Sequence, residues 1–411
     1  MRPAFVPVFV LLLVVAAVAV PVTGFTTPQN EAPSAFDSPP LMITPVDNFS
    51  NYASITPGNI SKSTYGSATV DIGTTVAADA TILRSNYRSS AFENRFYSAE
   101  DSAERDEIIR AEIDRLAVAT ATLQSERTTV IRSYADGSTS TETFIQSMAL
   151  IDAQAREVAL TVTKIKRASR SVSYSLPRSL DARLANLGGK AEVLSGPVAQ
   201  RASRAVAGGE TINAVYAESS DTGYTLAMVS DESYVRETYL ADERRPDATD
   251  QFRESDLYRV NAANRRGIEL YPWVTNDASP SGQALGETGI YRFRADYTSG
   301  ELTAYLDGGT TNVFREFQRQ SIAAVPTSDS VTARNDTVWV RVNKTYETGP
   351  MSVTVFENGT GRPLNATVSL NGQPLGQTGS DGLIWLVEPR SGVPITVNTS
   401  SGTTVAFRLP P

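Results

Sequence analysis

The pattern that most constrains the fold lies between Ser98 and Arg170, where apolar residues recur with helical spacing in two successive segments. In the first segment they repeat every seven positions, at Ile109, Leu116, Leu123 and Val130. In the second segment steps of four and three alternate from Phe144 to Ile165, and the turn signal Asp136-Gly137 separates the two. Helices of this kind bury their apolar rows against each other. The sequence therefore predicts an antiparallel coiled-coil hairpin.

Shorter helical signals flank this hairpin. Ahead of it, apolar residues spaced mostly by three and four occur at Val70, Ile72, Val76, Ala80 and Leu83. Ser98 and Asp101 resemble a capping box that begins the hairpin. Two shorter helices are expected after the hairpin, at Arg178–Leu187 before Gly188-Gly189 and at Pro197–Ala207 before Gly208-Gly209. We assign residues 66–208 to one helical domain.

From residue 209 to residue 328 the pattern changes to strands, and a short unit occurs twice. Each copy reads as a strand, a tight glycine turn, a strand, a loop, and then an apolar-Arg-Glu triplet at the expected start of a helix. The copies are Thr222–Val229 with Val235-Arg236-Glu237, and Ser299–Leu306 with Phe314-Arg315-Glu316. We expect a mixed α/β domain with an internal repeat.

Residues 329–411 alternate apolar and polar positions in short runs, as half-buried strands do. Strands are predicted at Thr337–Val342, Ser352–Phe356, Ala366–Leu370, Leu383–Val387, Ile395–Asn398 and Thr403–Leu409. Asn-Gly and Asp-Gly pairs at 358–359, 371–372 and 381–382 supply the turns. This pattern predicts a C-terminal β-sandwich, so the expected fold class is α+β and multidomain.

The N-terminal residues 1–24 have the layout of a secretory signal. Arg2 precedes an uncharged apolar stretch over residues 4–20, and small residues follow up to Gly24. The stretch also approaches the roughly 20 residues that span a bilayer, so an uncleaved signal anchor is the alternative. Cleavage is favoured, and membrane attachment is expected only through residues 4–20 if the signal is uncleaved. Residues 25–65, rich in Pro, Ser, Thr and Asn, are expected to form a flexible spacer.

The chain contains neither histidine nor cysteine. This composition excludes Ser-His-Asp and Cys-His catalysis, thiolate and imidazole metal sites, and disulfides. Its net charge of −8 argues against nucleic acid as a partner, because phosphate binding needs a basic field. Lysine occurs only at Lys62, Lys164, Lys166, Lys190 and Lys344, a scarcity that resembles the composition of proteins from salt-loving archaea. No cofactor and no metal are expected.

Asparagines in Asn-x-Ser/Thr sequons gather in two regions of the chain. They are Asn48, Asn59, Asn335, Asn343, Asn358, Asn365 and Asn398. No sequon lies between Asn86 and Asn312, so the spacer and the terminal sandwich are the expected glycan-bearing regions. The alternative is that Asn, Gly and Thr are simply common in β-turns.

Carboxylates are the main remaining route to catalysis. Acids gather in the strand-rich domain at Glu218, Asp221, Asp231, Glu232 and Glu237. A retaining glycosidase needs two carboxyl groups about 5 Å apart, and Trp273 is a candidate sugar platform. Such groupings arise by chance among the 45 acids of this chain, and Tyr271-Pro272-Trp273 is more often a packed corner. We therefore assign no catalytic residue.

Three resemblances to known families add to this interpretation. The stretches 99–170 and 269–273 resemble a family of secreted haloarchaeal surface proteins of unknown function. Residues 291–307 are similar to the strand–turn–strand element of PepSY-type domains, which are linked to peptidase inhibition or surface interactions. Residues 363–372 and 378–385 resemble prealbumin-like carboxypeptidase-regulatory modules, which are spacers or binding platforms. The resemblances imply a location outside the cytoplasmic membrane and a domain architecture, but no activity.

Together these features predict an exported, glycosylated, non-enzymatic structural or interaction protein, extracellular or at the cell surface. The helical hairpin is expected to serve as a stalk or self-association element, and another envelope protein is the other expected partner. A PepSY-like regulator that binds a peptidase or other envelope protein is the alternative function. A carboxylate glycosidase is a more distant one.

Overall fold

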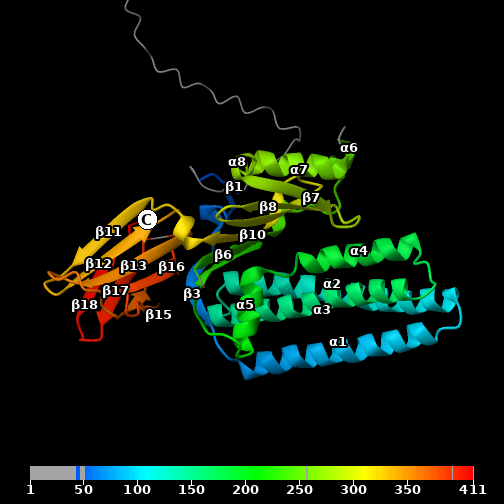
Figure 1. Cartoon of the computed structure of the whole chain (residues 1–411), viewed down its shortest axis with the longest axis horizontal. Helices are drawn as coiled ribbons and strands as arrows, with labels where there is room; N and C mark the ends of the chain where they lie inside the picture. Colours follow the sequence, from blue (N-terminus) through cyan, green and yellow to red (C-terminus); the bar gives the residue numbers. More distant parts are fainter. Residues whose placement is uncertain (1–42, 47–50, 231, 256–257, 391, 411) are drawn as a thin grey trace, which may run out of the picture. The chain divides into compact units, whose positions relative to one another are not determined.

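The computed structural model describes residues 43–46, 51–230, 232–255, 258–390 and 392–410. The described residues form the α+β multidomain fold that the sequence predicted (Figure 1). The expected signal at residues 1–24, the sequon at Asn48 and the candidate acid Asp231 lie outside the described residues.

A layer of long helices follows the edge strand β3 (Lys62–Ala68). Its members are α1 (Ile72–Ser98), α2 (Ser102–Ala135), α3 (Thr141–Ser171), α4 (Arg178–Glu192) and α5 (Pro197–Val206). Figure 1 shows α1 to α4 running side by side, with α5 across them. Because α3 contacts each of the other four helices, it is the centre of this layer.

Helices α2 and α3 form the predicted antiparallel hairpin. Gly137 in the connecting turn has a φ of +80°, which glycine adopts without steric cost. The start of α2 differs from the prediction. Asp101 is its N-cap, because the Asp101 carboxylate accepts a hydrogen bond from the Glu104 backbone N–H at 2.9 Å, whereas Ser98 is the last residue of α1.

The apolar rows of the hairpin are buried, apart from Val130 of α2, which is half-buried. Every residue of the predicted row between Phe144 and Ile165 in α3 is at most 6% exposed. In α2, Arg127 takes a buried position: its guanidinium lies 3.7 Å from the centre of the Tyr239 ring and donates to the Val193 carbonyl at 2.9 Å. The arginine is tolerated there because an aromatic face and a carbonyl replace water.

The centre of the protein is an antiparallel sheet with the strand order β3-β4-β5-β6-β10-β9-β8-β7. Its strands after β3 are β4 (Ile212–Ser219), β5 (Gly223–Ser230), β6 (Ser233–Leu240), β7 (Ala278–Ala284), β8 (Ile290–Tyr297), β9 (Gly300–Asp307) and β10 (Val313–Ser321). The two repeat copies thus lie in two three-stranded meanders, β4–β6 and β8–β10, which meet where β6 pairs with β10.

The sequence predicts that the apolar-Arg-Glu triplets of the repeat begin helices, and this prediction is wrong. Arg236 and Glu237 lie within β6, and Arg315 and Glu316 lie within β10. Successive strand residues point to opposite faces, so each triplet sends its arginine to one face of the sheet and its glutamate to the other. These charges are paired across the two strands, and the pairing allows them to be buried in the interior of the sheet.

The two faces of the sheet are covered by different elements. Tyr305 of β9 packs in the cluster formed by the helical layer, whereas its neighbour Ala304 packs in a cluster with α7 (Arg259–Leu270). The short helices α6 (Gln251–Glu254) and α8 (Val274–Asp277) accompany α7 (Figure 1). Both faces of this half of the sheet are therefore core surfaces.

The C-terminal region is the predicted β-sandwich of two four-stranded sheets. One sheet contains β11 (Asp329–Arg334), β12 (Val338–Lys344), β13 (Pro350–Glu357) and β16 (Leu383–Val387), and the other contains β14 (Ala366–Leu370), β15 (Gln373–Gln377), β17 (Pro394–Thr399) and β18 (Thr404–Arg408). Strands β11 and β15 had not been predicted. Asn371 and Gly372, with φ of +50° and +79°, make the predicted tight turn between β14 and β15.

Part of the expected spacer belongs to the folded body. Strand β1 (Ile43–Thr44) pairs with β2 (Tyr52–Ala53), and Tyr52 is 1% exposed. After the single turn η1 (Pro57–Asn59), β3 joins the edge of the central sheet. The backbone N–H of Ala53 donates to Glu316 at 2.9 Å, so a buried carboxylate holds this segment in place.

The glycine pair at 188–189 lies inside α4, where the sequence had predicted a helix end. A side chain at Gly189 would lie 2.7 Å from Cβ of Leu285, whereas one at Gly188 would meet nothing closer than Val162 at 3.8 Å. Gly189 therefore allows the loop before β8 to approach α4, and the helix continues to Glu192.

This contrast gives a matched pair of variants. G188A is expected to stabilise the protein by up to about 1 kcal/mol, since alanine is the better helix former. G189A is expected to destabilise it by about 1–3 kcal/mol, because Leu285 must move. Urea unfolding of both variants measures the difference, and equal effects would contradict the packing described.

Candidate interaction site

Two reciprocal ion pairs join the meanders at the centre of the sheet. Arg236 of β6 lies 3.3 Å from Glu316 of β10, and Arg315 of β10 lies 3.4 Å from Glu237 of β6. All four side chains are at most 1% exposed. Because the register pairs Gln318 with Arg236, the two ion pairs lie on opposite faces of the sheet.

The pair on the helical side also anchors α5. Glu237 accepts hydrogen bonds from the backbone N–H groups of Val198 and Ala199, at 2.9 and 3.3 Å. A carboxylate at a helix N-terminus satisfies unpaired N–H groups and opposes the positive end of the helix dipole. Gly196 is required there, since a Cβ would lie 2.1 Å from a Glu237 oxygen. Arg315 donates to the Ser195 carbonyl at 2.9 Å, so both charges hold the same turn.

The pair on the other face anchors the N-terminal segment and the end of α7. The Arg236 guanidinium lies 4.8 Å from the centre of the Tyr52 ring. Glu316 accepts from the Ala53 backbone and from the Tyr271 hydroxyl. Each ion pair thus joins the sheet to a different covering layer.

Asp152 of α3 lies beside the helical-side pair and is fully buried. It accepts from the Gly196 N–H at 3.1 Å and from Arg156 at 2.8 Å. Burial nevertheless raises the pKa of Asp152 to about 6, with Arg156 opposing that rise. The charged form of this carboxyl is therefore the costly one in the folded protein.

The acids considered for glycosidase chemistry do not converge. Glu218 and Glu237 lie on opposite faces of the sheet, and Asp221 and Glu232 are exposed. Each buried acid is neutralised in an ion pair, Glu218 by Arg390 and Glu237 by Arg315. Among the described residues there is also no group of three acidic side chains that could hold a metal ion.

The Tyr-Pro-Trp sequence forms a packed corner after α7. Tyr271 is fully buried and donates to Glu316, and Trp273 packs edge-on against Tyr297 with ring centres 4.7 Å apart. Trp273 is half-buried in this contact. It is not an open stacking platform in this arrangement.

The sandwich is held to the central sheet by one end of its strands. Arg390, which follows β16, donates two hydrogen bonds to Glu218 of β4, at 3.0 and 3.2 Å. Tyr234 of β6 donates to the Thr348 carbonyl at 2.6 Å, and Tyr65 of β3 donates to the Val387 carbonyl. The contacting residues lie in the connection between β12 and β13, at the last residue of β16 and shortly after that strand.

The sequons of the sandwich gather mainly at the opposite end of its strands. The Asn358 side-chain amide donates to the Asn335 carbonyl at 3.0 Å. The Asn335 amide donates to the Thr404 carbonyl at 3.3 Å, and the Thr404 hydroxyl donates to Asn398 at 2.7 Å. Asn365 precedes the first residue of β14, which pairs with Thr399 at the same end. No described sequon asparagine is buried, and Asn59, Asn358, Asn365 and Asn398 are exposed.

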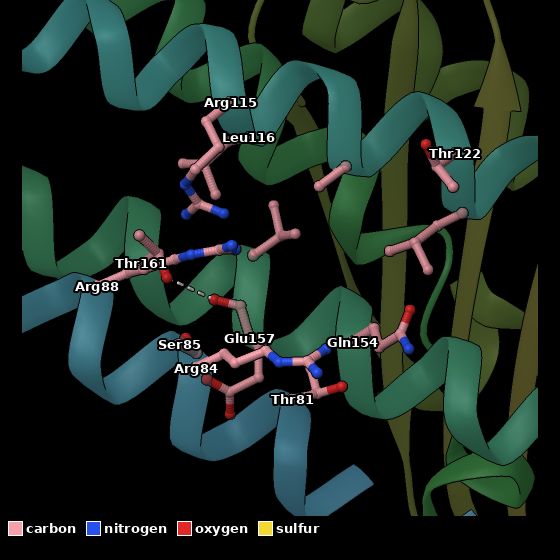
Figure 2. Close-up of a pocket in the computed structure, with 13 residues that line it drawn as sticks. Thr81, Arg84, Ser85, Arg88, Arg115, Leu116, Thr122, Gln154, Glu157 and Thr161 are labelled. Atoms are coloured by element: carbon pink, nitrogen blue, oxygen red, sulfur yellow. Dashed lines mark hydrogen bonds between the residues drawn. The ribbon is translucent and has the colours of Figure 1, made fainter. Parts of the chain in front are cut away.

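A hollow of about 270 Å³ opens between α1, α2 and α3. Figure 2 shows Arg84 and Arg88 of α1, Arg115 of α2, and Gln154 and Glu157 of α3 among the residues that line it. Neither Arg84 nor Arg88 is in an ion pair with another described residue, whereas Arg115 pairs with Glu112. The hollow contains one carboxylate, Glu157, and is suited to binding a polar or anionic group rather than to acid–base chemistry with two carboxyls.

The outer side of α1 carries large apolar side chains that the other described residues leave exposed. Ile72, Val76, Leu83 and Tyr87 are 77%, 60%, 69% and 78% exposed. The sequence had indicated this helix through the spacing of Ile72, Val76 and Leu83, but not which way they face. We call these four residues the α1 stripe.

Family models match three consecutive stretches of the chain. Residues 1–212 match a domain of unknown function (DUF7096), and residues 215–326 match a family of unknown function (DUF7094). Residues 329–406 match an archaeal fibronectin-III type-like domain. The first match covers 212 of the 411 residues, more than half of the chain. The chain belongs to the DUF7096 family. No curated protein and no solved structure matches it.

The DUF7096 match includes the whole helical layer and ends at the start of β4, and the DUF7094 match includes both copies of the repeat. The model that matches the sandwich is fibronectin-III-like, and the matches do not show the expected PepSY-like and prealbumin-like elements. Two domains of unknown function and a fibronectin-III-like domain fit a non-enzymatic structural or interaction protein. None of the helices in the described part of this DUF7096 protein has the length and apolarity of a bilayer-spanning helix.

Sequence reasoning missed the reciprocal ion pairs, although the signal was present. The repeated Arg-Glu dipeptide places opposite charges at Arg236, Glu237, Arg315 and Glu316. In two paired strands, such dipeptides supply one cation and one anion to each face. Recognising this requires the pairing of β6 with β10, which is not visible in the sequence.

Removal of Arg390 tests the attachment of the sandwich. R390M leaves the buried Glu218 carboxylate without its cation and is expected to cost about 3–5 kcal/mol. R362M is the control, because the Arg362 side chain is 70% exposed and its pair with Glu357 contributes little. Denaturant unfolding measures both, and equal unfolding free energies would contradict the role of Arg390.

Asp152 gives a testable pH dependence. A pKa near 6 in the folded state, above the unfolded value near 3.8, adds stability that is present below about pH 4 and lost as the pH rises through 6. The unfolding free energy of the wild type, relative to D152N, is expected to fall by up to about 3 kcal/mol between pH 4 and pH 7. Parallel pH profiles for the two proteins would show that the Asp152 pKa is unperturbed.

Proposed function

We propose that this chain is an exported, N-glycosylated structural or interaction protein, extracellular or at the cell surface, without enzymatic activity. The observation that carries the proposal is the division of the sandwich into two ends. One end packs on the central sheet through Arg390, Thr348 and Val387, and the other presents four sequons. A glycan there requires no change in the packed interface, because none of these asparagines is buried.

The chemistry of the described residues supports binding rather than catalysis. Glu218 and Glu237 are fully buried, paired with arginine, and separated by the sheet. The hollow beside α1 offers guanidinium and hydroxyl groups around a single carboxylate. A glycosidase would need a second carboxyl within about 5–10 Å of the first, in the same open site.

A PepSY-like regulator of an envelope peptidase is the alternative for the strand-rich domain. Such a regulator needs an open apolar face on that domain for its partner. The apolar residues of β8 and β9 are instead packed against α7 on one face and the helical layer on the other. A pull-down that returns an envelope peptidase, dependent on residues of β8 or β9, would favour this alternative.

Modification of Asn365 is expected in the native host. Asn365 is exposed, and its sequon is completed by Thr367 of β14. T367V keeps the shape of the side chain but removes the hydroxyl, and is expected to abolish the glycan mass on the peptide. T367S keeps a sequon and is expected to retain the glycan. Mass spectrometry of the purified protein measures both variants.

The same mass spectra also show at which residue the mature protein begins. A mature protein beginning at Phe25 indicates cleavage after Gly24, and an intact N-terminus in the membrane fraction indicates an anchor. Recovery of unglycosylated protein with an intact N-terminus from the cytosol would overturn the proposed function.

A further inference from the structure

The α1 stripe is an exposed apolar surface on a helix that is already packed on its other side. The inner face of α1 buries Ser89, Phe92 and Phe96 in the helical layer. At 100° per residue, the stripe lies on the side of the helix opposite to these residues. Helix α1 is therefore apolar on two faces, and only one of them has a partner among the described residues.

The stripe is continuous along the helix. Ile72, Val76, Leu83 and Tyr87 fall within about one quarter of the helix circumference and extend over roughly 22 Å. Ala80, half-exposed, fills the gap between Val76 and Leu83. Isolated exposed apolar residues are ordinary, but a contiguous apolar row on one face marks an interaction surface.

The spacing of the stripe is palindromic. Steps of four, seven and four residues make it symmetric about a point between Asp79 and Ala80. When two copies of α1 are laid antiparallel about a two-fold axis at that point, Ile72 faces Tyr87 and Val76 faces Leu83. At the centre, Ala80 faces Asp79 of the other copy. A two-fold interface requires this kind of self-complementarity.

The size of the stripe also fits a second copy. Two such stripes bury on the order of 1,000 Å² together, close to the roughly 1,200 Å² at which specific interfaces begin. Arg84 lies beside the stripe and meets small residues, Gly73 and Ala77, on the same side of the antiparallel partner, so no cations oppose each other. Asp79 is exposed next to the axis, so the two Asp79 carboxylates approach each other there, and the apolar row rather than charge complementarity supplies the contact. A membrane surface is the less suitable occupant, because a chain of net charge −8 is repelled by anionic lipid.

We propose that the protein self-associates as a two-fold dimer through the α1 stripe, with the two α1 helices antiparallel. The apolar rows of the α2–α3 hairpin are closed inside the monomer, so α1 rather than the hairpin supplies the contact. The inference deepens the proposed structural role. If the dimer proposal fails, the proposal of export and glycosylation still stands, because mass spectrometry tests that proposal separately.

Matched arginine substitutions test the surface. Leu83 of α1 and Val118 of α2 are both 69% exposed on helices, so L83R and V118R place the same charge at equally open positions. L83R is expected to raise the dimer dissociation constant about a hundredfold or more, because it buries an unpaired charge in the interface. V118R is expected to leave it unchanged. Sedimentation of the full chain, with circular dichroism to confirm folding, measures both.

Cross-linking tests the antiparallel register. Because the chain has no cysteine, A80C and S90C each introduce a single thiol. Two copies of A80C lie beside the proposed axis and are expected to be joined by a short thiol–thiol cross-linker. Ser90 lies on the same side of α1 as the stripe. In the antiparallel dimer the two copies of S90C would lie roughly 31 Å apart along the helix axis, so the cross-linker is not expected to join them.

The outcomes are distinct. A monomeric wild type, or a dimer equally sensitive to V118R and L83R, overturns the proposal. Cross-linking of S90C, whether or not A80C is also joined, overturns the antiparallel arrangement. A monomer that binds anionic vesicles and loses that binding in L83R would show that the stripe docks on lipid instead.

Discussion

The reciprocal ion pairs between β6 and β10 are the interaction on which the rest of the structure depends. They join the two meanders into one sheet, and each lies on a different face. Arg315 and Glu237 hold the turn before α5, and Arg236 and Glu316 hold Tyr52, Ala53 and Tyr271. A buried charge that loses its partner is costly, so these pairs specify one pairing of the meanders and one position for each covering layer.

The same sheet separates the surfaces available to partners. The helical layer covers one face and leaves the outer side of α1 open, with the arginine-lined hollow beside it (Figure 2). The sandwich is attached through Arg390 and Glu218, and its sequon-bearing end points away from that contact. The α1 stripe and the candidate glycan sites therefore lie on different elements.

Much of the fold could be predicted from local patterns. The hairpin of α2 and α3 follows from its apolar period, and the sandwich follows from alternation and from turns such as Asn371-Gly372. The failures share a cause. The glycine pair at 188–189 predicts a helix end, whereas Gly189 lies inside α4 where Leu285 approaches. Arg236-Glu237 predicts a helix start, whereas these residues lie in β6 and form ion pairs with β10. Contacts between residues far apart in the sequence decided both.

By itself the sequence determined the α+β class, the helical hairpin and the terminal sandwich, because periodicity and turn chemistry act within a few residues. It also excluded histidine- and cysteine-based chemistry, because those residues are absent. Only the tertiary structure decided which candidate acids are neutralised, which end of the sandwich packs on the central sheet, and which face of α1 is exposed among the described residues. Those properties depend on which side chain each residue contacts across strands and layers. Local sequence patterns do not predict these long-range contacts.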